Sequence, residues 1–377
     1  MPRAETAEVM NGIRLYRTGA LALFVALVAL IASSGGGTTA ELPRILSISP
    51  DAQEWTTFKA RFVRPDGRVV DTYNGDVSHT ESQGFGMLFA VAFDDRETFE
   101  RIWTWTDANL RWEGTWLHAW RYVPGNATPV PDANNATDGD LFIAWALARA
   151  AQRWHEPLYA EAARRIARDV RRLLVTEVGG RVVLLPGFNG FETGERVTVN
   201  LSYYVFPAIE AIIGIDPAPV WSSVRRDGLE LIEDARFGHW GLSPDWLQIA
   251  PTGEIRPAAD RPARFGYDAV RIPLYLVWAG LGTPERLRLY RGFWQEHWQE
   301  KRQPGWASLD GRSVAPYEAS NGLRSIGLIV DVAMGGGWSG EALPGITAQD
   351  DYYSASLILL SRIAVADLLR QSGTRGL

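Results

Sequence analysis

Four acidic residues lie at the starts of apolar segments, where a carboxylate needs a physical reason to be present. Asp138 and Asp140 are separated by one glycine at the start of one apolar segment, Glu81 begins an earlier one and Asp268 a later one. A carboxylate in apolar surroundings is unfavourable unless it is hydrogen-bonded, paired or chemically active. The simplest interpretation is a set of helix N-caps, because helix starts favour acidic residues. The recurrence of acids at these starts favours a shared acidic site.

Three carboxyl groups that converge on one cleft are typical of enzymes that hydrolyse glycosidic bonds. One group must stay protonated to donate to the leaving oxygen, and another must be ionised to activate water or attack the sugar. Burial raises the pKa of one carboxyl group, and an arginine partner keeps the pKa of the other low. Spacing alone does not assign these roles, but Arg271 follows Asp268 by three residues, whereas Glu81 has no evident cation. This asymmetry suggests a protonated Glu81 and an ionised Asp268.

The segment around Glu81 also has a purely structural interpretation. Ser78 and Glu81 have the spacing of a capping box at the start of a helix. Gly84 and Gly86 follow, and a glycine weakens a helix by about 1 kcal/mol relative to alanine. Both glycines therefore indicate that a ligand or an opposing helix approaches the backbone closely.

The composition excludes several classes of function. The net charge is −6, and the basic run at residues 164–172 has the helical spacing of a solvated outer face rather than of a nucleic-acid site, so a nucleic-acid partner is not expected. The 377 residues include no cysteine and five scattered histidines, so we predict no metal or other cofactor. Asp350 and Asp351 are interpreted as the N-cap of the final helix rather than as a metal site. The 16 Trp, 12 Tyr and 14 Phe residues suit a carbohydrate cleft, because sugar faces stack on aromatic rings.

The first 40 residues have the pattern of a secretory signal. Arg14 and Arg17 precede the apolar stretch 19–32, and small residues follow as far as Ala40. This order is typical of a signal peptide, and an uncleaved membrane anchor is the alternative. We predict a periplasmic or secreted monomer with a signal segment at 1–40 and a single catalytic domain at 41–377.

Helical periodicity dominates the remaining chain, and two kinds of helix alternate. Helices that are apolar on nearly all sides are buried, whereas amphipathic helices face water. The apolar segments are residues 82–93, 140–151, 201–213, 266–279, 321–333 and 352–368. The amphipathic segments are residues 54–63, 96–110, 157–175, 220–235 and 284–299.

This alternation predicts an all-α (α/α)6 toroid, in which six inner helices are surrounded by about six outer ones. The segment 54–63 is expected to pack against the last inner helix and close the ring, and the outer helix expected between 335 and 350 is short or missing. Minor hairpin strands are expected at 68–73 and 181–185. All inner helices of such a toroid begin at one end, so their first residues converge on a central cleft.

The segment around Asp138 resembles the signature of glycoside hydrolase family 8. It reads Ala136-Thr137-Asp138-Gly139-Asp140 and continues with Ile143, Ala144, Ala146, Leu147 and Trp154. Further matches lie, in order, at residues 81–87, 184–187, 199–203, 241–246, 267–271 and 352–353. The resemblance extends from about residue 54 to residue 368. It is strongest to the periplasmic endoglucanases encoded with bacterial cellulose synthases.

The resemblance implies a role for each matching residue. Glu81 matches the general acid of the family, Asp268 matches the general base of its inverting cellulases, and Asp138 matches the acid that binds sugar hydroxyls where cleavage occurs. The matches to substrate-binding positions are Tyr203, Tyr267, Arg271, Trp120, Tyr353 and Asn200. Asp140 is expected to be structural. Inversion implies a separation of about 6.5–9.5 Å between the acid and the base.

The activity that the resemblance implies is endo-hydrolysis of cellulose or a related β-1,4-glucan. It further implies a link to bacterial cellulose or exopolysaccharide synthesis and association with a cellulose synthase or secretion complex. Chitosan, mixed-linkage glucan and xylan are alternative substrates within the same family. A non-catalytic glycan-binding accessory protein is the alternative of a different class, and the presence of all three acids argues against it.

Overall fold

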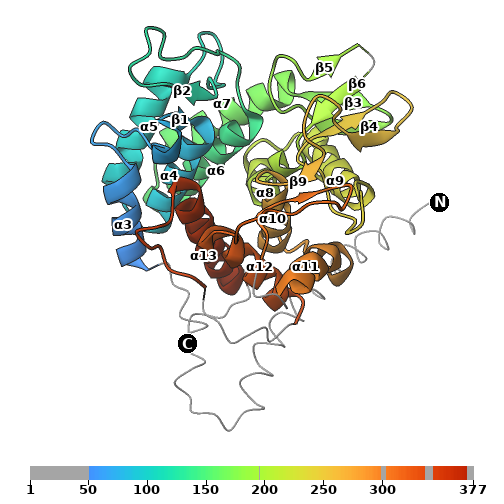
Figure 1. Ribbon diagram of the computed structural model, residues 1–377. Helices are drawn as coiled ribbons and strands as arrows, with labels where there is room; N and C mark the ends of the chain where they lie inside the picture. Colours follow the sequence, from blue (N-terminus) through green and yellow to red (C-terminus); the bar gives the residue numbers. More distant parts are fainter. Residues whose placement is uncertain (1–50, 195, 299–302, 336–342, 372–377) are drawn as a thin grey trace, which may run out of the picture.

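Helices wound into a barrel make up most of the protein (Figure 1). The computed structural model describes residues 51–194, 196–298, 303–335 and 343–371, so the predicted signal segment lies outside the described residues. The helices are α3 (Ala52–Phe62), α4 (Thr80–Ala92), α5 (Arg96–Leu110), α6 (Thr137–Trp154), α7 (Pro157–Leu173), α8 (Phe206–Ile215), α9 (Pro219–Asp234), α10 (Ile272–Trp278), α11 (Pro284–Trp298), α12 (Asn321–Ala333) and α13 (Tyr352–Gln371).

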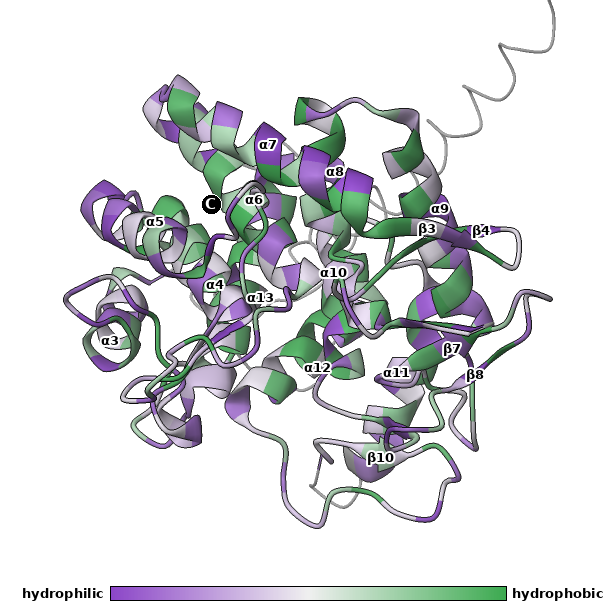
Figure 2. Ribbon diagram, turned by 90° about the horizontal axis from the view of Figure 1, so that it is seen from above, coloured by the Kyte–Doolittle hydropathy of each residue, from purple (hydrophilic) through white to green (hydrophobic). Residues whose placement is uncertain are grey.

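The inner ring consists of the helices that the sequence marks as apolar. Around the ring, α4 packs against α6, α6 against α8, α8 against α10, α10 against α12, α12 against α13, and α13 against α4. The outer helices α5, α7, α9, α11 and α3 pack on α4, α6, α8, α12 and α13 respectively. The view from above shows α3, α5, α7 and α9 at the periphery (Figure 2). The predicted (α/α)6 toroid is confirmed, including closure of the ring by α3.

The outer layer is incomplete among the described residues. Between α12 and α13, residues 334–335 and 343–351 contain no helix. This agrees with the prediction of a short or missing outer partner in this connection.

The inner helices begin at the same end of the barrel. The start of α6 meets the start of α4, because a methyl group at Gly139 would lie 2.2 Å from Thr80 Oγ1. The start of α12 meets the start of α13, where the Gly322 amide donates to Ser354 Oγ at 3.0 Å. The fold therefore brings residues that are distant in sequence to one end of the barrel, as predicted.

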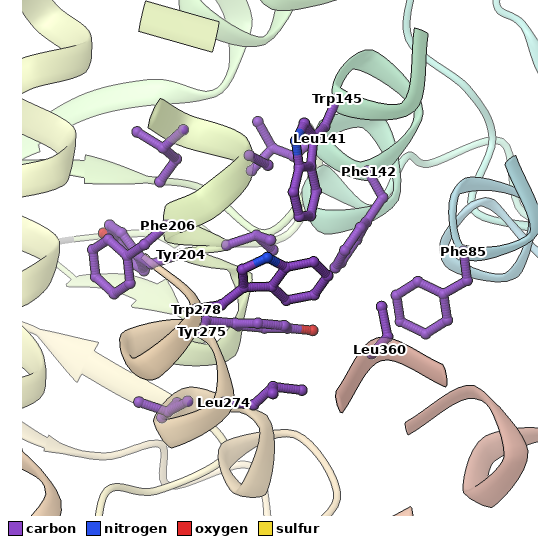
Figure 3. Packing of buried hydrophobic residues seen from close by; sticks show 14 of the residues in the cluster. Phe85, Leu141, Phe142, Trp145, Tyr204, Phe206, Leu274, Tyr275, Trp278 and Leu360 are labelled. Atoms are coloured by element: carbon purple, nitrogen blue, oxygen red, sulfur yellow. The ribbon is translucent and has the colours of Figure 1, made fainter. Parts of the chain in front are cut away.

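Aromatic side chains fill the interior of the barrel (Figure 3). Phe85 on α4 meets Phe142 on α6 edge to face, with ring centroids 4.7 Å apart. Phe142 in turn lies 6.0 Å from Tyr275 on α10, and Trp145 lies 4.9 Å from Trp278. Edge-to-face aromatic pairs add specific attraction to the burial of their area. The core thus locks the inner helices together.

Close packing of neighbouring parts of the chain explains the two glycines of α4. A methyl group at Gly84 would lie 2.6 Å from Phe142 Cβ, and one at Gly86 would lie 2.7 Å from Val69 Cγ2. Of the two explanations offered by the sequence, protein packing rather than a ligand accounts for both glycines.

Short segments lie between the helices, several of them at the end where α4 begins (Figure 1). The strands are β1 (Ser78–His79), β2 (Arg121–Tyr122), β3 (Val175–Val178), β4 (Arg181–Leu184), β5 (Glu192–Thr193), β6 (Arg196–Val199), β7 (Leu247–Ile249), β8 (Ile255–Pro257), β9 (Arg264–Phe265) and β10 (Ala307–Ser308). The 3-10 helices are η1 (Thr72–Asn74), η2 (Leu201–Tyr203) and η3 (Ala269–Arg271). Strands β5 to β8 form one antiparallel sheet, and the others pair as β1–β2, β3–β4 and β9–β10.

The two strand predictions have different outcomes. The strand expected at 181–185 is confirmed as β4, which forms a hairpin with β3. The prediction of a strand at 68–73 is wrong, because this segment makes isolated β-bridges and then enters η1. The Asp71 carboxylate accepts the Tyr73 amide at 3.1 Å, and such a local bond turns the chain instead of extending it.

Two inner helices begin later than predicted. The segment 201–213 forms η2 followed by α8, and the segment 266–279 forms η3 followed by α10. A proline lies in the first turn of both α8 and α10. Proline lacks an amide hydrogen and is tolerated only in the first turn of a helix, so neither α-helix extends further back. The irregular backbone ahead of both helices carries residues of the candidate site.

Candidate active site

Glu81 lies in the first turn of α4, and its carboxylate is not used to cap the helix. The His79 amide donates instead to Ser82 Oγ at 3.0 Å. The capping box predicted from Ser78 and Glu81 is therefore wrong, because Ser82 is the residue that satisfies the helix start. The Glu81 side chain, 20% exposed, contacts Arg271 Nη1.

The two acids at the start of α6 have different surroundings. Asp140 is fully buried and accepts the His118 amide at 3.1 Å, His118 Nδ1 at 2.8 Å and Asn135 Nδ2 at 2.9 Å. These bonds anchor the loop before α6. Asp140 therefore has the structural role that was expected of it. Asp138 accepts the adjacent Gly139 amide at 2.8 Å and has Arg271 Nη1 3.7 Å from its other oxygen.

Asp268 lies immediately before η3, one turn ahead of Arg271. Arg271 Nη2 donates to Asp268 Oδ1 at 2.9 Å and to Ser202 Oγ at 3.1 Å. The ion pair that the spacing suggests is present. The Asp268 side chain is 30% exposed, so it remains open to the cleft.

Arg271 brings the three acids together. Its guanidinium is 4% exposed, and it contacts Asp268 through one terminal nitrogen and both Glu81 and Asp138 through the other. The expectation that Glu81 lacks a cation is therefore wrong. Its partner is distant in sequence, and only the closed ring of helices brings the two residues together.

The acids carry more negative charge than one guanidinium compensates. Burial raises the pKa of Asp138 to about 7. Burial, together with the carboxylates of Asp245 and Asp138, raises the pKa of Asp268. The expectation that Arg271 keeps the pKa of Asp268 low is thus wrong, because desolvation and repulsion outweigh the attraction. The raised pKa values of Asp138 and Asp268 let the site hold a proton near neutral pH.

The other predicted binding residues surround these acids. Burial and the carboxylates of Asp138 and Asp268 raise the pKa of the Tyr203 hydroxyl on η2. Asn200 is fully buried, and its side-chain oxygen accepts the Ser202 amide at 3.0 Å and Ser202 Oγ at 2.8 Å, so it lies beside the hydroxyl that Arg271 also contacts. The Tyr353 hydroxyl donates to the carbonyl oxygen of Tyr267.

Tyr267 and Trp120 present aromatic surface on separate loops. The Tyr267 side chain is exposed, and its hydroxyl lies 2.8 Å from that of Tyr317, which also accepts Trp306 Nε1 at 3.1 Å. Trp120 stacks on His79 with centroids 5.9 Å apart, and its carbonyl accepts the Thr80 amide at 3.0 Å. Trp120 is therefore fixed close to Glu81.

Sequence reasoning missed a second aromatic group beside the site. The Trp246 ring lies parallel to Phe191 at 5.9 Å, is 6.1 Å from Tyr203, and has the Arg261 guanidinium 4.0 Å from its centroid. Phe191 directly precedes β5, Trp246 directly precedes β7, Tyr203 lies on η2 and Arg261 follows β8. The signal that was available is the Trp within the matching segment 241–246.

Asp245, next to Trp246, was also missed as a site residue. Its carboxylate accepts the Gly266 amide at 2.8 Å, the Ala269 amide at 2.9 Å and Arg264 Nε at 3.1 Å. It therefore holds the loop that carries Asp268.

Among the described residues, no group of three or more His, Asp or Glu side chains is arranged to hold a metal ion. Asp351 Oδ1 accepts the Ser354 amide at 2.7 Å at the start of α13. Asp350 accepts Thr347, Asn321 and Ser354. The pair thus caps α13, in agreement with the structural interpretation.

Known proteins are similar to this chain in sequence and in fold. The sequence pattern of glycosyl hydrolases family 8 matches residues 25–366. A probable endoglucanase of Novacetimonas hansenii is 43% identical over 322 residues, covering 85% of this chain and 92% of that protein. An endoglucanase of Cellulomonas uda is 39% identical over 276 residues, covering 72% of this chain and 75% of that protein. The structure of the endo-β-1,4-glucanase CMCax from Acetobacter xylinum superposes with a TM-score of 0.80 at 41% identity, covering 86% of this chain and 99% of that one. The chain therefore belongs to glycosyl hydrolase family 8.

Proposed function

We propose that this family 8 enzyme is a secreted endo-β-1,4-glucanase that hydrolyses cellulose or a related β-1,4-glucan with inversion. The observation that carries the proposal is the Arg271 guanidinium, which joins Glu81, Asp138 and Asp268 at the end of the barrel where the inner helices begin. The relatives named as endoglucanases, at 39–43% identity, support the substrate class.

In the proposed mechanism, Glu81 donates its proton to the glycosidic oxygen as the bond to the anomeric carbon breaks. Asp268 takes a proton from a water molecule, whose oxygen attacks the anomeric carbon from the opposite face of the ring. Asp138 accepts hydrogen bonds from sugar hydroxyls and helps to hold the ring distorted. Arg271 keeps the three carboxyl groups in place. Each turnover consumes one water molecule and leaves Glu81 ionised and Asp268 protonated until protons are exchanged.

The aromatic side chains support a flat, neutral glucan as substrate. Trp120 lies near Glu81, while Tyr267 and Tyr317 are exposed on the segments around Asp268. Aromatic faces bind the C–H faces of β-linked sugars without requiring charge. Reducing-sugar release from carboxymethylcellulose, measured beside chitosan, mixed-linkage glucan and xylan, tests this choice, and faster hydrolysis of chitosan or xylan would contradict it.

The roles of the acids are tested by substitution. Glu81→Gln is isosteric but cannot donate a proton with useful acidity, so we expect at least a ~10³-fold loss of kcat on carboxymethylcellulose with cello-oligosaccharide binding nearly intact. Calorimetric titration with cellopentaose measures the binding. Unchanged turnover would remove Glu81 from the mechanism, and intact binding without hydrolysis in the unmodified enzyme would favour a glycan-binding accessory protein.

The location and the assembly are also proposals. The basic and apolar pattern of residues 14–40 supports export to the periplasm or beyond, and the sequence resemblance supports a link to cellulose synthesis and association with a cellulose synthase or secretion complex. Cell fractionation tests export, co-purification with the synthase tests the association, and light scattering tests the proposed monomer. Full recovery in the cytoplasm would contradict the proposed location.

A further inference from the structure

We propose that Asp245 is a positioning residue that fixes the backbone on both sides of Asp268 and so directs the Asp268 carboxylate at the reacting water. This inference rests on the proposed function, in which Asp268 is the base. It concerns a residue outside the group that contacts the sugar.

Two backbone bonds carry the inference. The amides of Gly266 and Ala269 bracket Asp268 in the chain, and both donate to the same oxygen, Asp245 Oδ1, at 2.8 and 2.9 Å. The other oxygen accepts Arg264 Nε at 3.1 Å. Asp245 is 4% exposed, and bonds to a buried carboxylate are stronger than those between neutral groups. The loop therefore cannot move without breaking charge-assisted bonds.

The loop is shaped to accept this carboxylate. A methyl group at Gly266 would lie 2.5 Å from Asp245 Oδ2, so any larger residue there would displace it. The Asp245 amide in turn donates to the Arg264 carbonyl at 2.9 Å, which ties the chain ahead of β7 to β9. Asp245 thus joins the segment before β7 to the loop before α10.

The negative charge of Asp245 also affects the pKa of the Asp268 carboxyl group. The charged and titratable side chains that face Asp268 are Arg271, Asp138, Tyr203, Tyr275, Tyr353, Arg264 and Asp245. Among them the Asp245 and Asp138 carboxylates raise the pKa of Asp268. A substitution that removes the Asp245 charge leaves the other side chains around Asp268 in place. A shift in the titration of Asp268 can therefore be traced to Asp245.

Two substitutions separate position from charge. Asp245→Asn keeps a carbonyl oxygen for both amides, and Arg264, whose side chain is 38% exposed, can turn away from the new amino group. Asp245→Ala removes every acceptor. We expect Ala to lower kcat by roughly 10–100-fold with KM changed less than about threefold. We expect Asn to restore kcat to within about threefold of the unmodified enzyme and to move the acidic limb of the kcat/KM profile to lower pH by roughly 0.5–1 unit.

Asp227→Asn is the matched control. Asp227 is 3% exposed, accepts the Val182 amide at 2.8 Å and pairs with an arginine at 2.6 Å, as Asp245 does, but on α9 beside β4. We expect this variant to lower thermal stability and to leave the pH profile unchanged. A purely structural role for Asp245 would give the same result at both positions.

The outcomes are distinct. A folded Asp245→Ala enzyme with kcat within threefold of the unmodified enzyme, beside an inactive Asp268→Asn enzyme, overturns this inference alone. Asp268→Asn with full turnover overturns the proposed function as well. If the Asp245→Ala variant does not fold, the Asp245→Asn variant provides the test. An acidic limb of its kcat/KM profile that stays at the pH of the unmodified enzyme contradicts the inference.

Discussion

At the scale of single residues, the chemistry depends on how one cation is shared. Arg271 is almost fully buried and contacts Glu81, Asp138 and Asp268, each from a different element. Removing one partner from a buried ionic group leaves uncompensated charge, which is strongly unfavourable. Arg271 therefore sets both the geometry and the proton affinity of the site.

Loss of this cation should change activity and its pH dependence together. In Arg271→Met the carboxylates lose their attraction to the guanidinium, so their pKa values rise and the acidic limb of kcat/KM moves to higher pH. We expect kcat to fall by at least ~10²-fold, measured on cello-oligosaccharides from pH 4 to 9. Arg149→Met is the control, because Arg149 also holds a half-buried aspartate, Asp367 at 2.6 Å, and lies far along α6 from the acids. Equal effects of both variants on the pH profile would contradict this account.

Asp138 should lower the free energy of unfolding at neutral and higher pH, because its carboxyl group is buried in the site. Its pKa in the folded protein is about 7, against an ordinary value of 3.8. Between these values the unfolded chain has released the proton and the folded chain still holds it, so the contribution of Asp138 to stability falls as pH rises. We expect Asp138→Asn to increase the free energy of unfolding at pH 8 by about 2 kcal/mol and to change it little at pH 4, by urea denaturation. An equal change at both pH values would contradict the assignment.

At the scale of elements, the close contact between the starts of α4 and α6 places two acids side by side. A methyl group at Gly139 would lie 2.2 Å from Thr80 Oγ1 and 2.8 Å from the Glu81 amide. The glycine between Asp138 and Asp140 is thus a packing requirement, and it couples the helix contact to the position of Glu81.

Gly139→Ala should therefore damage both stability and catalysis. Overpacking of a tight interior contact costs about 1–3 kcal/mol, and displacement of Glu81 should lower kcat by ~10-fold or more. Thermal unfolding and carboxymethylcellulose hydrolysis measure the two effects. Gly292→Ala on α11 is the control, since a methyl group there meets nothing within 4 Å, and we expect it to stabilise by roughly 0.5–1 kcal/mol. Full activity of Gly139→Ala would contradict the coupling.

At the scale of the whole molecule, the periodicity of apolar residues was sufficient to predict the toroid. Buried and amphipathic helices differ in every turn, so their alternation is visible without coordinates. The starts of α8 and α10 were misplaced because Pro207 and Pro273 lie inside runs that are mostly apolar on both sides of the proline. The β5–β8 sheet was missed because its strands are two to four residues long, too short for a periodic signal.

The site was predictable only in part, for a related reason. Motif residues such as Glu81, Asp138 and Asp268 can be matched one by one, and the structure brings them together around Arg271. Glu81 and Arg271 meet because the ring of helices closes. The spacing of residues along the chain gives no sign of this contact. The support of the Asp268 loop by Asp245 likewise depends on contacts across the barrel end.

The stereochemistry of hydrolysis tests the central claim most directly. In the proposed mechanism, Glu81 is the acid and Asp268 the base on opposite sides of the scissile bond, and inversion requires them to lie about 6.5–9.5 Å apart with room for water. Hydrolysis of cellopentaose followed by proton NMR from the first minutes reports the anomer formed before mutarotation. We expect the new reducing ends to appear first as the α-anomer. Initial release of the β-anomer would show retention and would contradict the assignment of Asp268 as the base.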